Sequence, residues 1–306
     1  MDLPSLVKEA LNVHTSGFIE LVDKATGALQ SDVEHSGNFV VINRLVDLES
    51  RGEALVVGDL HGDLQSLINI LQTSGFIEKM EQNKDVVVVF LGDYGDRGPN
   101  SAEIYYIVLS LKVAFSRQVV LLRGNHEGTK KLMAYPHDLP VQFQERFGTH
   151  GSIAYQKTMS LFPYLYNAVY VKDRYLMVHG GISPLIANLL DIAQAQEDHN
   201  ETLLEDLLWS DPTEDGGVYP NPRGAGILFG RAVTEEVFSK IGAELLIRGH
   251  EACPEGFRIN HGGKVLTLFS RKGQPYNNRH GAYLLLPLAK KFDDAAELVA
   301  ACLRQF

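Results

Sequence analysis

The chain has 306 residues, of which 45% are hydrophobic and 22% are charged, and this is the composition of an ordinary globular protein with an ample core. Its 28 basic and 38 acidic residues give a net charge of -10, which argues against nucleic acid or an anionic membrane surface as a partner. The two cysteines, Cys253 and Cys302, are too few for a disulfide framework or a thiolate metal cluster.

The beginning of the chain, to about residue 35, is predicted to be helical, because apolar residues recur with a helical period at Phe18, Ile19, Val22 and Leu29. It lacks the basic and apolar regions of a signal peptide, and no apolar run has the length of a membrane span. We therefore expect a cytoplasmic protein. Residues 1–50 are expected to form a partly helical extension packed on one catalytic domain that covers residues 1–306.

Short strands and amphipathic helices are predicted to alternate from residue 54 onward, which indicates an α/β fold. Two of the helices have apolar faces at Leu64–Leu71 and Ile104–Leu111, with Asp63 and Ser101 as N-caps. Residues 196–224 are predicted to form a long, irregular functional loop. The six predicted strands are Ala54–Val57, Val86–Leu91, Val119–Leu122, Tyr175–Val178, Leu245–Ile247 and Val265–Phe269.

Polar motifs follow the predicted strands directly. Three of them are GDLHG at 58–62, GDYGDRG at 92–98 and RGNHE at 123–127, and His179 and His250 follow two later strands. Loops at the carboxyl ends of such strands converge on one edge of a sheet. Carboxylate and amide oxygens together with neutral imidazoles suit manganese, iron or zinc. Two such ions held by a shared carboxylate are used for phosphoryl displacement, so the pattern predicts hydrolysis of a phosphate ester.

Each motif alone is weak evidence, because Gly-Asp after a strand is also a common turn and a lone histidine is usually structural. Glycine stands beside every candidate ligand, where it would let the backbone turn sharply and approach the ions. Several such motifs in order, each after a strand, are hard to explain as turns. The glycines concerned are Gly58, Gly92, Gly124, Gly180, Gly181 and Gly249.

With HGG at 179–181 and LWSDP at 208–212, the series resembles the signature motifs of the metallo-dependent serine/threonine phosphoprotein phosphatases over about residues 50–285. The resemblance implies the α/β metallophosphatase (calcineurin-like) fold, a central β-sandwich of two mixed sheets flanked by helices. It also implies two divalent metal ions, with manganese favoured over iron or zinc. The implied ligands are Asp59, His61 and Asp93 for the first ion, and Asp93, Asn125, His179 and His250 for the second.

The same resemblance implies a mechanism in which a hydroxide that bridges the two metals attacks phosphorus. His126 would protonate the leaving oxygen, and Asp96 would orient the His126 imidazole. Arg123 and Glu127 are expected to form a structural ion pair, and Trp209 to anchor the loop that carries Asp211. The residues expected to bind the substrate phosphate are Arg97, Arg223, Asn125 and Tyr276.

Two segments depart from the eukaryotic pattern of this family. Residues 271–278 lack the loop cysteine of that branch, and Tyr276 only loosely replaces its tyrosine; residues 135–140 also differ. These departures indicate a prokaryotic member of the family, with an archaeal source as one option, and leave substrate preference and toxin binding open. No role is assigned to His14, His35, His137, His150, His199, His261 and His280.

Three functions are compared on this basis. The first is a hydrolase that removes phosphate from phosphoserine and phosphothreonine of protein substrates, with regulatory partners unknown. The second is a diadenosine polyphosphate hydrolase, which shares the GD-x-HG and GNH pieces. Glu127, the Asp96-Arg97-Gly98 triplet and residues 209–212 favour the first. The third, a non-catalytic scaffold, predicts lost ligands, whereas all the implied ligands are present.

Overall fold

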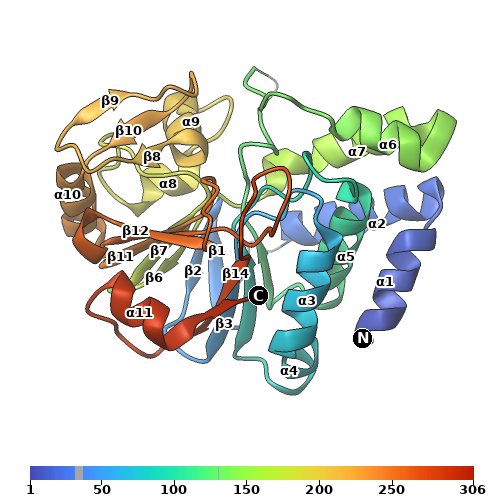
Figure 1. Cartoon of the computed structure of the whole chain (residues 1–306), viewed down its shortest axis with the longest axis horizontal. Coiled ribbons are helices and arrows are strands. Elements are labelled where there is room, and N and C mark those ends of the chain that lie inside the picture. Colours follow the sequence, from blue (N-terminus) through green and yellow to red (C-terminus); the bar gives the residue numbers. More distant parts are fainter. Residues whose placement is uncertain (32–36, 130) are drawn as a thin grey trace.

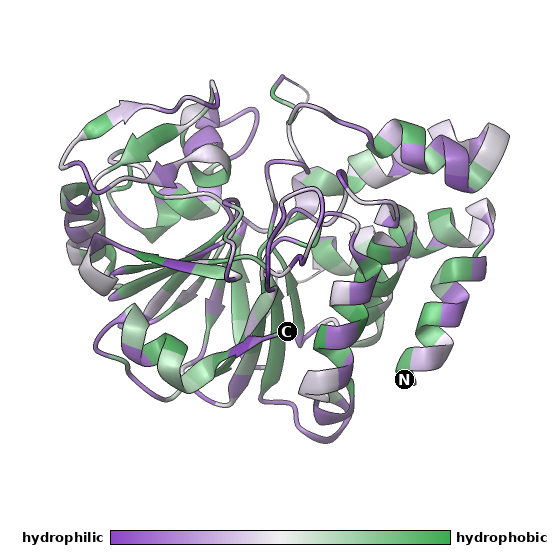
Figure 2. Ribbon diagram, viewed as in Figure 1, coloured by the Kyte–Doolittle hydropathy of each residue, from purple (hydrophilic) through white to green (hydrophobic). Residues whose placement is uncertain are grey.

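The computed structural model describes residues 1–31, 37–129 and 131–306. Two large β-sheets lie face to face at the centre, with one group of helices on each outer side, as Figure 1 shows. The strands are apolar along most of their length, which Figure 2 shows in green. This is the predicted α/β sandwich of two mixed sheets flanked by helices, and the prediction is confirmed.

One sheet has five strands in the order β15-β14-β3-β4-β5. Its strands β3, β4 and β5 are parallel, and β14 runs antiparallel to β3. The strands are β3 Glu53–Val57, β4 Val86–Phe90, β5 Val119–Leu121, β14 Ala282–Pro287 and β15 Leu303–Gln305.

The other sheet has seven strands in the order β1-β2-β6-β7-β11-β13-β12. Its strands β7, β11 and β13 are parallel neighbours, as are β2 and β6, whereas β6 runs antiparallel to β7 and β12 runs antiparallel to β13. The strands are β1 Phe39–Ile42, β2 Leu45–Leu48, β6 Ala168–Val171, β7 Tyr175–Val178, β11 Leu245–Arg248, β12 Phe257–Asn260 and β13 Val265–Leu268.

Alternate side chains of the seven-stranded sheet enter two different cores, because successive residues of a strand point to opposite faces. In β7, Tyr175 and Met177 join the core shared with the five-stranded sheet, whereas Leu176 and Val178 pack in a second core. The second core also contains residues of α8 Leu189–Gln194, α9 Glu201–Trp209 and α10 Arg231–Ile241. Both faces of this sheet are therefore buried.

The other helices lie outside the second core, and the last of them, α11, is near the end of the chain. Helix α2 packs on α5 and α7, and α11 packs on β14. A small sheet of β8 Asp211–Pro212, β9 Val218–Pro220 and β10 Ile227–Phe229 lies beside α9 and was not predicted. The helices outside the second core are α1 Leu3–Asn12, α2 Thr15–Ser31, α3 Leu64–Ser74, α4 Phe76–Gln82, α5 Ser101–Ala114, α6 Leu139–Phe147, α7 Gly151–Leu161 and α11 Ala295–Cys302.

All six predicted strands are present within one residue of their predicted ends. The N-terminal helical prediction is confirmed for Leu3–Asn12 and Thr15–Ser31, and its last part falls on 32–36, outside the described residues. Asp63 caps α3 as predicted, since its carboxylate accepts a hydrogen bond from the N–H of Ser66. No helix in the described part of the chain combines the length and the apolar character of a membrane span.

Two local predictions are wrong. Ser101 is not the N-cap of α5 but its first residue, because its hydroxyl accepts the N–H of Asp96 and Asn100 takes the cap position. The stretch 196–224 is not irregular throughout, because α9 occupies Glu201–Trp209. Leu203, Leu204 and Leu207 of that helix are buried, and their packing stabilises the helix.

The carboxyl ends of the parallel strands of both sheets meet at one edge of the sandwich. A parallel bridge between Asp59, after β3, and Phe269, after β13, joins the two sheets there. The polar motifs that follow β3, β4, β5, β7 and β11 therefore converge on one place.

Removing the ring of Phe18 should destabilise the protein by about 3–5 kcal/mol, because Phe→Ala in a packed core has that cost. Phe18 is fully buried, and its ring lies 5.5 Å from that of Phe143 and 5.1 Å from that of Phe147. Urea unfolding of Phe18→Ala measures the loss, with the exposed Leu11→Ala in α1 as control. A loss as small as that of the control would contradict the packing of α2 on α6.

Candidate dinuclear metal centre

The side chains at this edge come from tight loops in which several residues adopt a left-handed backbone. His61, Asp93 and His250 have φ values of 44°, 53° and 73°. Non-glycine residues rarely adopt such values, and they concentrate at functional sites. The loops thus aim their side chains into the space between the strand ends rather than along the strands.

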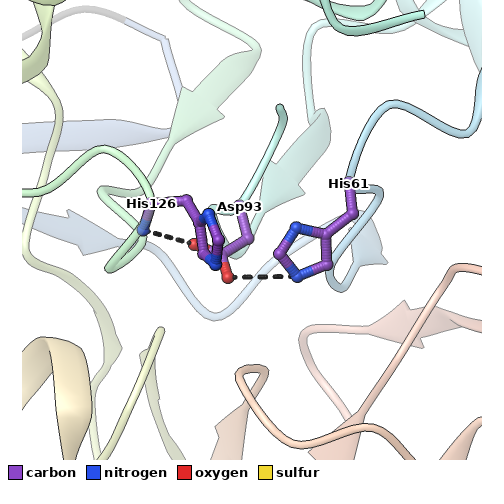
Figure 3. Close-up of side chains that lie close together, drawn as sticks. All are labelled: His61, Asp93 and His126. Carbon is purple, nitrogen blue, oxygen red and sulfur yellow. Dashed lines mark hydrogen bonds and ion pairs between the residues drawn. The ribbon is translucent and has the colours of Figure 1, made fainter. Parts of the chain in front are cut away.

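The first group of candidate ligands surrounds the carboxylate of Asp93. His61 Nε2 lies 3.3 Å from Asp93 Oδ2 and 3.7 Å from Asp59 Oδ2. The backbone N–H of His126 donates to Asp93 Oδ1 at 3.0 Å, and Figure 3 shows His61 and His126 on either side of this carboxylate. His61, Asp93 and His126 offer ligand atoms within 4.8 Å of one another.

The second group lies on the other side of the same carboxylate. His179 Nε2 is 3.4 Å from Asp93 Oδ1 and 3.0 Å from Asn125 Oδ1. His250 Nδ1 is also 3.0 Å from Asn125 Oδ1. Asp93, His179 and His250 again offer ligand atoms within 4.8 Å of one another. All six predicted metal ligands are therefore brought together, with Asp93 shared between the two groups.

The hydrogen bonds of His61 and His179 show which ring nitrogen of each carries the proton and which one can bind a metal ion. His61 Nδ1 lies 3.0 Å from the carbonyl oxygen of Gly95, and His179 Nδ1 lies 2.9 Å from that of Leu91. A carbonyl only accepts, so each Nδ1 carries the proton and each Nε2 of the neutral ring carries a lone pair. Both lone pairs face oxygen atoms of Asp93 and Asn125, and an ionised Asp93 carboxylate repels them unless a cation lies between. The donor set therefore fits divalent metal ions.

The protonation preferences of the groups lead to the same conclusion. Burial lowers the pKa of His61, His179 and His250 well below its ordinary value, so these rings are neutral at pH 7. Burial raises the pKa of the Asp59 carboxyl, and for Asp93 burial and the adjacent charge of Asp59 both raise the pKa. Cations beside the carboxylates would lower those pKa values again.

Two glycines allow these carboxylates to approach the neighbouring backbone. A Cβ on Gly249 would lie 2.3 Å from Asp59 Oδ1, and a Cβ on Gly124 would lie 2.2 Å from Asp93 Oδ1. The close approach is needed because the N–H of His250 donates to Asp59. The predicted role of the glycines in turning the chain is seen only at Gly92, which alone of the six candidate glycines has a positive φ.

His126 and Asp96 form the predicted pair at the rim of this cluster. His126 Nδ1 lies 2.6 Å from Asp96 Oδ2, which leaves Nε2 facing the pocket. Burial opposes the charged form of Asp96, but hydrogen bonds from His126 and His137 outweigh it and lower the pKa of Asp96 below its usual value. Asp96 is thus held as an anion beside the imidazole.

Arg97 and Arg223 lie at the same pocket, and each guanidinium group is held by a neighbouring oxygen atom. The Arg97 guanidinium donates to the carbonyl oxygen of Tyr135 at 3.0 Å. Arg223 Nε donates to Asp211 Oδ2 at 2.8 Å. Asp211 Oδ1 in turn accepts a 2.9 Å bond from the fully buried Arg248. Both guanidinium groups keep further N–H donors available for an anion.

The pocket that the cluster forms has a volume of about 710 Å³. Its floor includes the buried His61, Asp93 and His250, and its rim includes residues that are partly or largely exposed, namely Leu132, Met133, Tyr135 and Pro275. The Tyr135 side chain is 91% exposed at this rim. A phosphate group could thus reach the floor while the chain that carries it stays on the apolar rim.

Tyr276 and Trp209 line this pocket too. The Tyr276 ring lies 5.4 Å from the His61 ring, so the loosely aligned loop does bring a tyrosine to the site. The guanidinium of Arg271, from the same loop, donates to the carbonyl oxygen of His61. Trp209 is mostly buried against His250, at 5.9 Å between rings. The residues of the atypical loop therefore support the floor of the pocket.

The predicted ion pair between Arg123 and Glu127 is wrong. Arg123 pairs with Glu197 at 2.7 Å and donates to the backbone carbonyl oxygens of Glu127 and Gly128. The Glu127 carboxylate instead accepts the N–H groups of Asp93, Tyr94 and Gly124 and the hydroxyl of Tyr105. It therefore fixes the backbone of the GDYGDRG and RGNHE loops relative to each other.

Sequence reasoning missed His137, Tyr155 and Arg248. His137 Nδ1 lies 2.8 Å from Asp96 Oδ2, and His137 Nε2 lies 2.9 Å from the hydroxyl of Tyr155. The one available signal was the unusual segment 135–140, which contains His137. Arg248 belongs to the motif Arg248-Gly249-His250, but its role could not be read from that motif, since its partners come from residues 180, 210, 211 and 251.

Residues 53–254 match the model of the calcineurin-like phosphoesterase family. A probable serine/threonine-protein phosphatase of Encephalitozoon cuniculi is 34% identical over 275 residues, which is 88% of this chain and 58% of the relative. The chain thus spans little more than half of that relative's length. The serine/threonine-protein phosphatase PP1-1 of Saccharomyces cerevisiae is 35% identical over 226 residues, 72% of this chain and 70% of the relative.

A solved structure shares the whole fold. It is a protein serine/threonine phosphatase from Saccharomyces cerevisiae with similarity to human phosphatase PP5. It superposes with a TM-score of 0.77 over 100% of this chain and 96% of its own, at 21% identity. The comparisons do not test the predicted prokaryotic source, which stays a prediction.

Manganese should stabilise protein that has been freed of metal with a chelator, because an ion that binds only the folded state raises the free energy of unfolding. At 100 times the dissociation constant the free energy of unfolding rises by about 2.7 kcal/mol per site. Thermal unfolding with and without added Mn²⁺ measures this, and Asp93→Asn should abolish most of the shift. His199→Asn, a change of an exposed histidine, is the control. Equal unfolding of the wild type with and without the ion would contradict the site.

The lowered pKa of Asp96 predicts a pH dependence of stability. The carboxylate ionises more readily in the folded than in the unfolded chain, so its contribution is complete above the unfolded pKa of about 3.9. It is lost as pH falls below that value toward the folded pKa. The stability difference between wild type and Asp96→Asn, measured by urea unfolding in chelator, should therefore be constant from about pH 7 to 5 and shrink below about pH 4. A stability difference between wild type and Asp96→Asn that grows as the pH falls would contradict the lowered pKa of Asp96.

Proposed function

Because the chain belongs to the calcineurin-like phosphoesterases, and among them to the serine/threonine-protein phosphatases, we propose that it hydrolyses phosphoserine and phosphothreonine esters of protein substrates. The observation that carries the proposal is the convergence of six ligand side chains, an imidazole and two guanidinium groups on one pocket. Proteins named as serine/threonine phosphatases are similar to the chain over most of its length.

The residues of the pocket have separable roles in this proposal. Arg97 and Arg223 would grip the non-bridging phosphate oxygens, where bonds to a planar guanidinium strengthen as charge develops. Asn125 and Tyr276 would contact the same phosphate. His126 would give a proton from Nε2 to the leaving oxygen, while Asp96 fixes the tautomer through Nδ1.

Two divalent ions would be held by Asp59, His61 and Asp93 and by Asp93, Asn125, His179 and His250. When bound, they would neutralise phosphate charge and lower the pKa of a bound water molecule to near neutral pH. We propose manganese as the ion, with iron or zinc as alternatives that the same ligands accept. A cytoplasmic location is part of the same proposal.

The two alternative functions are less well supported. A diadenosine polyphosphate hydrolase would share part of the motif series, but the sequence relatives bear the names of protein phosphatases. A non-catalytic scaffold would have lost a ligand or the acid, whereas His126, Asp96 and both arginines are present and line or support the pocket.

His126→Asn should lower kcat on a phosphoserine or phosphothreonine peptide by about two to four orders of magnitude, because general acid catalysis contributes that much. The manganese content of the variant should match that of the wild type, since the roles proposed for the metal ligands do not include the His126 ring. Steady-state kinetics and metal analysis measure the two effects, and the exposed His199→Asn is the control.

The same assay run on diadenosine tetraphosphate distinguishes the substrate classes. We expect turnover of the phosphopeptide and little turnover of the dinucleotide. Rapid hydrolysis of the dinucleotide alone would overturn the proposal, and unchanged turnover in His126→Asn would overturn the assigned acid.

A further inference from the structure

Asp96 needs support from outside its own loop. Asp96 and Arg97 both have a left-handed backbone, with φ values of 63° and 69°. Residues other than glycine rarely adopt this backbone conformation unless contacts with the surrounding structure hold them in it. Two neighbours in sequence that both need such support are therefore expected to contact another segment.

That segment is Tyr135–Leu139, which leads into α6. The carboxylate of Asp138 accepts the backbone N–H of Arg97 at 3.2 Å, and the carbonyl oxygen of Tyr135 accepts the Arg97 guanidinium. The N–H groups of Asp138 and Leu139 donate to Asp96 Oδ1 at 3.0 and 2.7 Å. One segment thus holds both Asp96 and Arg97.

The second oxygen of Asp96 is shared by two imidazoles. His126 Nδ1 lies 2.6 Å and His137 Nδ1 lies 2.8 Å from Asp96 Oδ2. The carboxylate therefore accepts four hydrogen bonds, two at each oxygen, which fills its usual acceptor sites. Asp96 is fully buried, so its orientation depends on these donors rather than on water.

Helix α7 fixes the far side of the second imidazole. The hydroxyl of Tyr155 lies 2.9 Å from His137 Nε2, and the two rings lie 5.7 Å apart. Because Asp96 can only accept from the Nδ1–H of His137, a neutral ring accepts the Tyr155 hydroxyl at Nε2. The pocket is lined by His126 and not by His137, so His137 has no direct route to a substrate.

We propose that His137, held by Tyr155, is a positioning residue that orients Asp96 and through it the His126 imidazole. The proposal rests on the function proposed above, since it assigns His126 as the acid of that reaction. Without His137, Asp96 Oδ2 keeps one donor and the side chain gains freedom to rotate away from His126. Displacements of about 1 Å at such a group lower turnover by on the order of a hundredfold.

The test compares the wild type with His137→Ala and Tyr155→Phe, each alone and combined with His126→Asn. His137→Ala should lower kcat by about 10–100-fold and leave KM unchanged, as loss of a supporting hydrogen bond does. Tyr155→Phe keeps the ring and should give a smaller loss in the same direction. His150→Ala, an exposed histidine beside α7, is the control and should match the wild type.

The His126→Asn background separates positioning from general destabilisation. In that background His137→Ala should cause no further loss of kcat, because its effect passes through His126. An equal loss in both backgrounds, an effect on KM alone, or an unchanged kcat in the single variants would overturn the proposal.

Imidazole NMR of protein labelled with ¹⁵N at histidine tests the same contact without turnover. We expect both His126 and His137 as Nδ1–H tautomers, and a shift of the His126 signals in His137→Ala but not in His150→Ala. If the metal-loaded wild type hydrolyses no phosphate ester, the proposed function fails, and these spectra still decide the contact. Unshifted His126 signals would overturn the positioning role.

Discussion

The carboxylate of Asp93 is the group on which the rest of the site depends. Its oxygens lie 3.3 Å from Nε2 of His61 and 3.4 Å from Nε2 of His179, at the edge where the two sheets meet. A buried carboxylate next to Asp59 is strongly disfavoured in water-free surroundings. Two cations between these donors would remove the repulsion. The fold thus places side chains together in an arrangement that bound ions would stabilise with both carboxyl groups ionised.

The backbone carries a related strain. Five of the ten non-glycine residues with positive φ in the described chain belong to the site: His61, Asp93, Asp96, Arg97 and His250. Each costs about 1–2 kcal/mol relative to an ordinary conformation. Buried hydrogen bonds from Glu127 and from the segment that begins α6 offset this cost. The rigid loops hold ligands that flexible loops would not keep in place.

The sequence predicts the strands and the motifs because both are local: apolar β-branched runs end at polar residues. It predicts neither the partner of Arg123 nor the position of His137, because these depend on how distant segments pack. Glu197 lies 74 residues from Arg123, and no spacing rule connects them. The sequence also does not indicate the left-handed conformation of His61 and His250, because its pattern predicts the turns at the neighbouring glycines.

A crystal structure of the manganese-loaded protein, measured at the manganese absorption edge, tests the central claim most directly. The account predicts two anomalous peaks, one on each side of the Asp93 carboxylate. One peak would lie beside His61 and Asp59, and the other among Asn125, His179 and His250. A single peak that Asp93 does not share, or no peak at this edge of the sandwich, would contradict it.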